Sequence, residues 1–217
     1  MTALATDFRR EEPLSERTLD TLRHAVRTAG ADADVVVVSL HSHARRKDPR
    51  TPPEFLVRTC RDVVDSGAHV VVVHGPHVMR PIEFYRGGLI CYGLGSLVLR
   101  PDDAAQPAEA YTTRGLRPGD GQGLTEHRLR ELAASGEDCT ALVVEVTVED
   151  GTARRVELHP ALLDTDPRSP SVGLPAPVAP AGMAAAKSTL GMLGAELTDL
   201  PRGILAALGR ISASSRG

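Results

Sequence analysis

Aromatic residues are scarce in this chain, and tryptophan is absent. Only 3% of its 217 residues are Phe or Tyr, so a buried core must be built from Val, Leu, Ile and Ala. Few aromatic side chains also leave little material for stacking nucleic-acid bases. The formal net charge is -3, which provides no general attraction to nucleic acid or to an anionic membrane. We therefore expect no nucleic-acid partner.

Long apolar segments and paired cysteines are also missing. No apolar run is long enough to span a bilayer. The first residues, MTALATDFRREEPL, lack the apolar stretch of a signal peptide, so a cytoplasmic location is the default expectation. The three cysteines, Cys60, Cys91 and Cys139, are an odd number without metal-site spacing. They are interpreted as reduced, small hydrophobic residues.

Histidine, by contrast, is concentrated in one segment. Five of the 8 histidines fall between positions 41 and 77. In this segment a run of four valines is twice followed by a pair of histidines, after Val35–Val38 and again after Val70–Val73. Such β-branched runs indicate strands that are buried on both faces, as in a parallel sheet. The five histidines are His41, His43, His69, His74 and His77.

Helices are predicted before and between the valine runs. Residues 15–29 have helical periodicity, with Ser15 as the N-cap and Gly30 at the end. The sequence Thr51-Pro52-Pro53-Glu54 resembles a capping box with proline at the first helical position. The helix that follows should end at Gly67. Its apolar stripe consists of Leu56, Cys60, Val63 and Val64.

A strand-helix-strand unit of this length predicts two parallel strands. Their carboxyl ends then meet at one edge of the sheet, where open α/β folds bind ligands. His41, His74 and His77 are therefore candidate metal ligands, because imidazole commonly binds Zn, Mn or Fe. His43 is either a ligand or a neighbour that hydrogen-bonds one. The alternative is that all four are ordinary loop residues.

The remaining histidines are interpreted as structural. His69 begins the second valine strand at the opposite edge, and His24, His127 and His159 lie on helical surfaces or at a strand end. Glu83 is expected in a strand ion pair, with orientation of a metal ligand as the alternative.

Downstream, the pattern changes from helical crossovers to hairpins. Residues 81–94 predict one hairpin, and strands around Asp150-Gly151 predict another. Residues 101–122 have loop composition, and a short helix is expected at 124–134. The predicted organisation is a domain at 1–164, a proline-rich linker at 165–181 and a helical tail at 182–217. The helices of that tail are expected at 182–197 and 202–210.

Two stretches resemble the CapA family of capsule and poly-γ-glutamate biosynthesis proteins. They are VVVVSLHSH at 35–43 and SGAHVVVVHGPHVMRPIEFYRGGLICYGLGSLVL at 66–99. The resemblance covers about residues 15–160, is specific in residues 35–99 and loose beyond 165, and corresponds to the C-terminal half of the family domain. It implies part of a calcineurin-type metallophosphoesterase fold, an α/β/β/α sandwich. It also places His41, His74 and His77 at metal-site positions, with His43 as a ligand or proton shuttle.

Several residues depart from the family pattern. Ala44 stands where many relatives have Glu, His69 replaces Asp, and Ser96 replaces Asn. The aspartate-containing motifs and the Asn-Asn-His segment typical of the front of the domain are not found before Leu14. A site built from histidines alone would be weaker and mononuclear. We therefore expect a truncated domain, or one that a partner chain completes with the missing half.

The resemblance implies a role in capsule or poly-γ-glutamate synthesis. The cofactor would be a divalent Mn, Fe or Zn ion, and the substrate a small molecule or a γ-glutamyl polymer. If the chain is active, it would be hydrolase- or transferase-like, with a metal-activated water. One alternative is a non-catalytic remnant or binding subunit. Another is a metal-dependent phosphoesterase that another chain completes.

Overall fold

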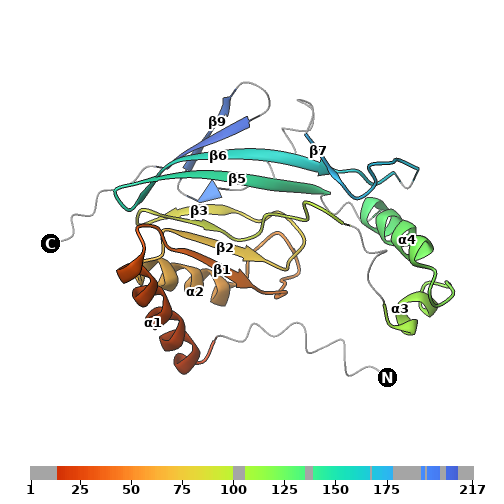
Figure 1. Ribbon diagram of the computed structural model, residues 1–217, viewed down its shortest axis with the longest axis horizontal. Helices are drawn as coiled ribbons and strands as arrows, with labels where there is room; N and C mark the ends of the chain where they lie inside the picture. The colour runs from red at the N-terminus through yellow and green to blue at the C-terminus, as the bar shows by residue number, and fades with distance from the viewer. Residues whose placement is uncertain are drawn as a thin grey trace.

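A computed structural model describes residues 14–99, 106–134, 139–166, 168–177, 192–193, 195–200 and 204–209. Two β-sheets stack on each other, and two helices cover the outer face of one of them (Figure 1). The helices are α1 (Glu16–Asp32), α2 (Glu54–Asp65), α3 (Ala108–Thr112) and α4 (Gly121–Ala134). This arrangement confirms a partial α/β fold of the metallophosphoesterase-like type.

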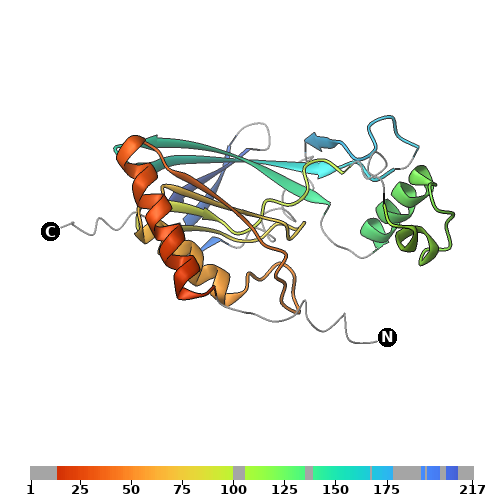
Figure 2. The ribbon, with the colours of Figure 1, turned by 60° about the horizontal axis from the view of Figure 1, so that its bottom comes forward.

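The first sheet lies between the helices and the second sheet. In spatial order it contains β1 (Val37–His41), β2 (Val70–His74), β4 (Gly88–Cys91), β3 (Ile82–Tyr85) and β8 (Met192–Leu193). The second contains β5 (Thr140–Glu149), β6 (Thr152–Leu163), β10 (Ile204–Gly209) and β9 (Ala195–Leu200), and β7 (Pro175–Pro177) also pairs with β6. In Figure 2, α1 and α2 lie side by side against the first sheet.

The predicted strand-helix-strand unit is confirmed. β1 and β2 are parallel, and their register pairs Val37 with Val70 and His41 with His74. β2 also runs parallel to β4, which pairs with β3 in the predicted hairpin. The carboxyl ends of β1 and β2 therefore lie together at one edge of the first sheet.

The prediction that both valine strands are buried on two faces is wrong for β1. β1 is at the end of the strand order, and Val37 is 60% exposed. β2 has β1 on one side and β4 on the other, and Val71 and Val73 are fully buried. A valine run reports β-propensity, whereas burial depends on the neighbours that the fold supplies.

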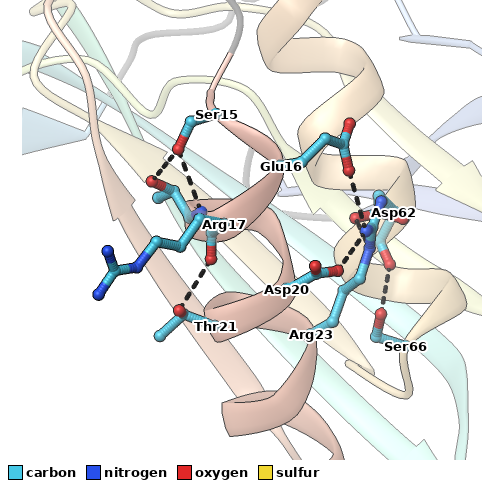
Figure 3. Close-up of polar contacts among 9 residues, drawn as sticks. Ser15, Glu16, Arg17, Asp20, Thr21, Arg23, Asp62 and Ser66 are labelled. Atoms are coloured by element: carbon cyan, nitrogen blue, oxygen red, sulfur yellow. Dashed lines mark hydrogen bonds and ion pairs between the residues drawn. The ribbon is translucent and has the colours of Figure 1, made fainter.

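Helix α1 begins where the sequence predicts and ends later. The Ser15 hydroxyl accepts a hydrogen bond from the Thr18 amide, as an N-cap does (Figure 3). Gly30 does not end the helix, which continues to Asp32. A glycine inside a helix costs about 1 kcal/mol. This cost is small beside the packing of α1 against α2 and the first sheet, so the helix continues through Gly30. Arg23 of α1 donates to Asp62 of α2 at 2.8 Å (Figure 3).

Helix α2 has the predicted buried stripe but not the predicted cap. Its N-cap is Pro53, without a side-chain hydrogen bond, and the Thr51 hydroxyl instead donates to Asp48 at 2.7 Å. The predicted capping box is therefore wrong, because the Thr51 hydroxyl bonds to Asp48 instead of capping the helix. Gly67 follows the helix at φ +116°, and its amide donates to the Val64 carbonyl, so the predicted stop is confirmed.

Two apolar clusters hold the layers together. One lies between α1, α2 and the first sheet and includes Val26, Val63, Val71 and Tyr92. The other lies between the sheets and includes Met79, Ile82, Leu89, Val156 and Leu158. As expected from the composition, most of these residues are aliphatic.

The connecting segments are more structured than the sequence predicts. Residues 108–112 form α3 where a loop was expected, and α4 begins at Gly121 rather than at 124. Within the predicted linker, residues 168–174 form turns, and β7 pairs antiparallel with β6. Proline is compatible with such a short strand at the margin of a sheet.

The predicted helical tail is wrong where the structure describes it. Residues 195–200 and 204–209 form the antiparallel strands β9 and β10, and β10 pairs with β6. Residues 182–191 lie outside the described part of the chain. Alanine and leucine are strong helix formers, but intrinsic propensity is small beside tertiary contacts, and pairing with the edge of an existing sheet outweighs it.

The long hairpin of the second sheet is confirmed. Asp150 and Gly151 join β5 to β6 with φ angles of +48° and +67°, as a two-residue hairpin turn requires. In the described part of the chain, no helix combines the length and apolar character needed to cross a bilayer.

Candidate functional site

The four candidate histidines lie at one edge of the first sheet. His41 and His74 are the last residues of β1 and β2 and are direct register partners. The Ser42 amide donates to the His74 carbonyl at 2.9 Å, which extends the pairing by one residue. The imidazoles of His41 and His74 meet edge to face, with ring centroids 4.6 Å apart.

His43 brings a second ring nitrogen to His41. The two Nε2 atoms are 2.9 Å apart. In a metal-free pair, one Nε2 carries a hydrogen and donates it to the other Nε2, which accepts it. Two imidazoles on one ion would also place their nitrogens about 2.9–3.4 Å apart, given metal–nitrogen bonds of about 2.0–2.1 Å. The observed separation lies at the lower, octahedral end of this range, so the pair fits two adjacent positions around one ion.

His74 and His77 contact the other histidines ring to ring, whereas their ring nitrogens lie beside serine hydroxyls. His74 Nε2 lies 2.8 Å from the Ser39 hydroxyl. His77 Nδ1 lies 3.3 Å from the Ser96 hydroxyl, and its ring centroid is 5.6 Å from that of His43. His77 has a backbone φ of +60°, which is uncommon for a residue with a side chain.

The four rings thus form one chain of contacts, in the order His74, His41, His43, His77. Their nitrogens do not all converge on one point, because two of the rings bond to serines. Among the described residues, the set that brings three potential ligand atoms within 4.8 Å of one another lies elsewhere. The metal-ligand roles of His41, His74 and His77 and the catalytic role of His43 stay predictions.

Gly75 makes the close approach of these segments possible. Its φ is +106°, and an added Cβ would lie 2.9 Å from the Ser42 carbonyl oxygen and 3.0 Å from His41 Nε2. A side chain at this position would displace the His41 ring. Gly75 lies between His74, which ends β2, and His77 in the following loop, and it is therefore part of the site.

Two arginines connect the loops that carry the histidines, and the sequence interpretation did not include them. Arg80 is fully buried and donates to the carbonyls of Ala44 and Pro49, both at 2.9 Å. Arg45 donates to the Pro76 carbonyl at 2.9 Å. The sequence signal that could have revealed Arg80 is its place directly after the apolar residues Val78 and Met79. An arginine in an apolar segment is buried only where specific partners meet it.

Glu83 belongs to a strand ion pair, as expected, rather than to the histidine site. Its carboxylate accepts two hydrogen bonds from Arg61, at 2.6 and 3.0 Å, and one from the Tyr92 hydroxyl at 2.6 Å. Burial is the main reason that the pKa of Tyr92 rises above its ordinary range, and the Glu83 carboxylate adds to the effect. Cys91 is a core residue, and burial raises its pKa to about 12.

A second group of potential ligands lies on the long hairpin. Glu145, Glu157 and His159 place their ligand atoms within 4.8 Å of one another. Glu145 and Glu157 are register partners across β5 and β6, and Arg155 forms an ion pair with Glu157. The sequence interpretation treated His159 as structural and missed this group, because the glutamates are 12 positions apart and meet only through strand pairing.

Fold and site together define a class: part of an α/β sandwich with a histidine-rich edge at the ends of parallel strands. Comparison with protein families places the chain more narrowly. Residues 2–100 match the family described as bacterial capsule synthesis protein PGA_cap. This segment of the chain is similar to capsule synthesis proteins, which is the similarity that its motifs predict.

Individual relatives agree with the family match. The PGA biosynthesis protein CapA of Bacillus subtilis (strain 168) is 41% identical over 66 residues, which are 30% of this chain and 17% of that protein. The capsule biosynthesis protein CapA of Bacillus anthracis is 34% identical over 67 residues, or 31% and 16%. The protein y4sH of Sinorhizobium fredii is 34% identical over 91 residues, or 42% and 19%. The matches thus span less than a fifth of each relative.

Proposed function

We propose that this chain acts in the synthesis of a capsule-type polymer of the poly-γ-glutamate kind and binds a divalent metal ion at its histidine edge. The family match supports the biological role. The observation that carries the metal site is the 2.9 Å separation of the His41 and His43 Nε2 atoms at the ends of parallel strands, with two more imidazoles beside them.

In this proposal, His41 and His43 would hold the ion, and His77, whose ring centroid lies 5.6 Å from that of His43, would be the third ligand. Bound Mn, Fe or Zn would supply a Lewis acid and a water with a pKa near about 7. His74 stays hydrogen-bonded to Ser39 and supports the His41 ring through their 4.6 Å contact. The substrate would be a γ-glutamyl polymer or a small precursor of it.

Metal titration of the purified chain tests this site. We expect calorimetry with Mn or Zn to show one ion per chain. The His41→Ala/His43→Ala double variant should lose at least about tenfold in affinity, because loss of even a group that only supports a metal ligand costs that much. His24→Ala, an exposed histidine on α1, is the matched control.

The second group on the hairpin must be tested in the same experiment. If His159→Ala abolishes binding and the double variant does not, the ion occupies the Glu145, Glu157 and His159 group instead. Binding that survives in every variant would reject the histidine-edge proposal.

A second candidate function is a metal-dependent phosphoesterase completed by another chain. The observation that favours it is the exposed β1 edge: among the described strands, β1 pairs on one side only, and Val37 is 60% exposed. An open strand edge is suited to pairing with another strand. Turnover of a chromogenic phosphodiester by the purified chain, lost in His41→Ala/His43→Ala, would support it. Metal binding without turnover would favour a non-catalytic binding role.

A further inference from the structure

The open edge of strand β1 carries none of the side chains that usually prevent a strand from pairing further. Among the described strands, β1 pairs only with β2, and it lies at the margin of the first sheet (Figure 1). Its exposed positions are Val37, Ser39 and His41, and Val35 just before it is 42% exposed. Proteins commonly protect such edges with lysine, other charged residues or proline, and β1 contains none of these.

The edge of the second sheet gives a direct comparison. Strand β5 also stands at one end of its described strand order. Its exposed positions, however, are Val143, Glu145, Thr147 and Glu149. Two carboxylates on one exposed face repel the same face of another β5 strand. The β5 edge is thus protected in the common way, and the β1 edge is the more suitable pairing surface.

The backbone of β1 directs hydrogen-bonding groups along its open edge. On the inner side, the Ser42 amide donates to the His74 carbonyl at 2.9 Å. Backbone groups of successive residues alternate between the two sides of a strand, so those of Val37, Ser39 and His41 point away from β2. A second strand can therefore pair with these three residues, with Ser39 at the centre.

The charges that flank β1 differ in sign between its two ends. Asp32 and Asp34 precede the strand, are exposed, and form no ion pair within the described part of the chain. His43 and Arg45 follow the strand and are also exposed. Arg45 donates to a backbone carbonyl, and the nearby Asp48 carboxylate is hydrogen-bonded within its own loop. The strand therefore has an acidic beginning, an uncharged middle and a basic end.

We propose that two copies of this chain associate by antiparallel pairing of their β1 strands, about a twofold axis at Ser39. In this register Val37 lies opposite His41 of the second copy. Asp34 then lies beside residues 43–45 of that copy. A twofold interface must complement itself, and β1 does so because antiparallel pairing sets its acidic end against the basic end of the other copy. This self-complementary charge favours a second copy over a chain of unlike sequence.

The dimer joins the two first sheets into one continuous sheet and brings the two histidine edges to a common interface. A single pair of short strands buries little surface, so the dissociation constant should be on the order of micromolar. The inference goes beyond the proposed function, because it needs neither a metal ion nor a reaction at the histidines.

Sedimentation velocity of the purified, metal-free chain over a range of concentrations tests the dimer. We expect a reversible monomer–dimer equilibrium that Val37→Lys weakens at least about tenfold, because a lysine on an edge strand opposes pairing. Val143→Lys is the matched control, since Val143 is 45% exposed on the β5 edge. It should change the association less than about twofold, as surface substitutions outside an interface do.

An exchange of charges tests the antiparallel register. Asp34→Lys and His43→Asp should each weaken self-association roughly threefold or more, because each sets like charges against each other across the interface. A mixture of the two variants should form dimers again, since the introduced cation then faces the introduced carboxylate. Both positions are exposed and lie outside the strand, so these variants keep the test decisive if Val37→Lys does not fold.

The outcomes separate the dimer from the proposed function. A chain that stays monomeric at every concentration would reject the second copy as the occupant of the β1 edge. Equal weakening by Val37→Lys and Val143→Lys would reject β1 as the interface. Mixed charge variants that fail to restore dimers would reject the antiparallel register. None of these results depends on metal titration, so a dimer without a bound ion would support the interface while rejecting the metal site.

Discussion

At the scale of single residues, Gly75 decides whether the two histidine-bearing segments can meet. It combines a left-handed backbone with the absence of a side chain, and both are needed. The left-handed φ turns the chain back after His74, and the missing Cβ leaves room for the His41 ring 3.0 Å away. Sequence alone shows a glycine between two histidines and cannot show what it faces.

Gly75→Ala should therefore destabilise the fold and displace His41. We expect a loss of about 2 kcal/mol or more, since a left-handed alanine costs roughly 1–2 kcal/mol before any clash. The measurement is denaturant unfolding, with imidazole NMR signals reporting on the His41 and His43 pair.

Gly115→Ala is the control for backbone strain alone. Gly115 also has a positive φ, +71°, but nothing lies within 4 Å of its added Cβ. It should cost about 1 kcal/mol and leave the histidine signals unchanged. An equal effect of the two substitutions would show that Gly75 acts only through its backbone.

At the scale of elements, the Glu83 carboxylate connects helix α2 to the first sheet. Glu83 lies on β3 and is 4% exposed, Arg61 comes from α2, and Tyr92 follows β4. The carboxylate is thus satisfied by groups from three segments. Such a buried charge stabilises the arrangement only while its partners are in place.

Glu83→Gln should loosen this connection. It keeps the size of the side chain and removes the charge, so we expect a loss of about 1–3 kcal/mol in unfolding free energy. Glu54→Gln is the control, because the Glu54–Arg58 pair on α2 is mostly exposed and such pairs contribute about 0.5 kcal/mol or less. Similar small effects of both substitutions in urea unfolding would contradict the role of Glu83.

The elements differ in how far the sequence predicted them. The β1–α2–β2 unit and both hairpins were predictable, because valine runs, an amphipathic stripe and turn dipeptides are local signals. The strands β9 and β10 were not, because their residues favour helix and only pairing with β6 makes them strands. The division into domains at 164 and 181 stays a prediction.

At the scale of the whole molecule, the core holds the thiols of Cys60 and Cys91 and the hydroxyl of Tyr92 in their neutral forms. Burial raises the pKa of Cys60 to about 12, with smaller contributions from the nearby Glu83 and Cys91. Burial alone raises that of Cys91 to about 12, and Tyr92 is shifted upward as well. In the unfolded chain a thiol has a pKa of about 8.5. These groups therefore stabilise the fold fully below that pH and progressively less as the pH rises towards 12.

We predict a steep loss of stability at alkaline pH. Each buried thiol should remove about 1.4 kcal/mol per pH unit above its unfolded pKa. Urea midpoints measured from pH 7 to 10.5 should fall accordingly. In Cys60→Ala/Cys91→Ala the fall should be shallower, even though the variant is less stable at pH 7. A slope that is the same in both proteins would assign the alkaline loss to other groups.

The sequence by itself determined that His41 and His74 share one sheet edge, because a helical crossover between two strands makes them parallel. It also predicted the similarity to capsule synthesis proteins, through motifs between positions 35 and 99. Only the tertiary structure decided which imidazoles touch, since ring directions depend on Gly75, Ser39 and Ser96. It also decided that Arg80 donates to the carbonyls of Ala44 and Pro49, because that contact joins segments that no local pattern relates. The pairing of Glu145 with Glu157 depended on the structure as well, because a register shift next to Thr147 sets which residues of the predicted hairpin face each other.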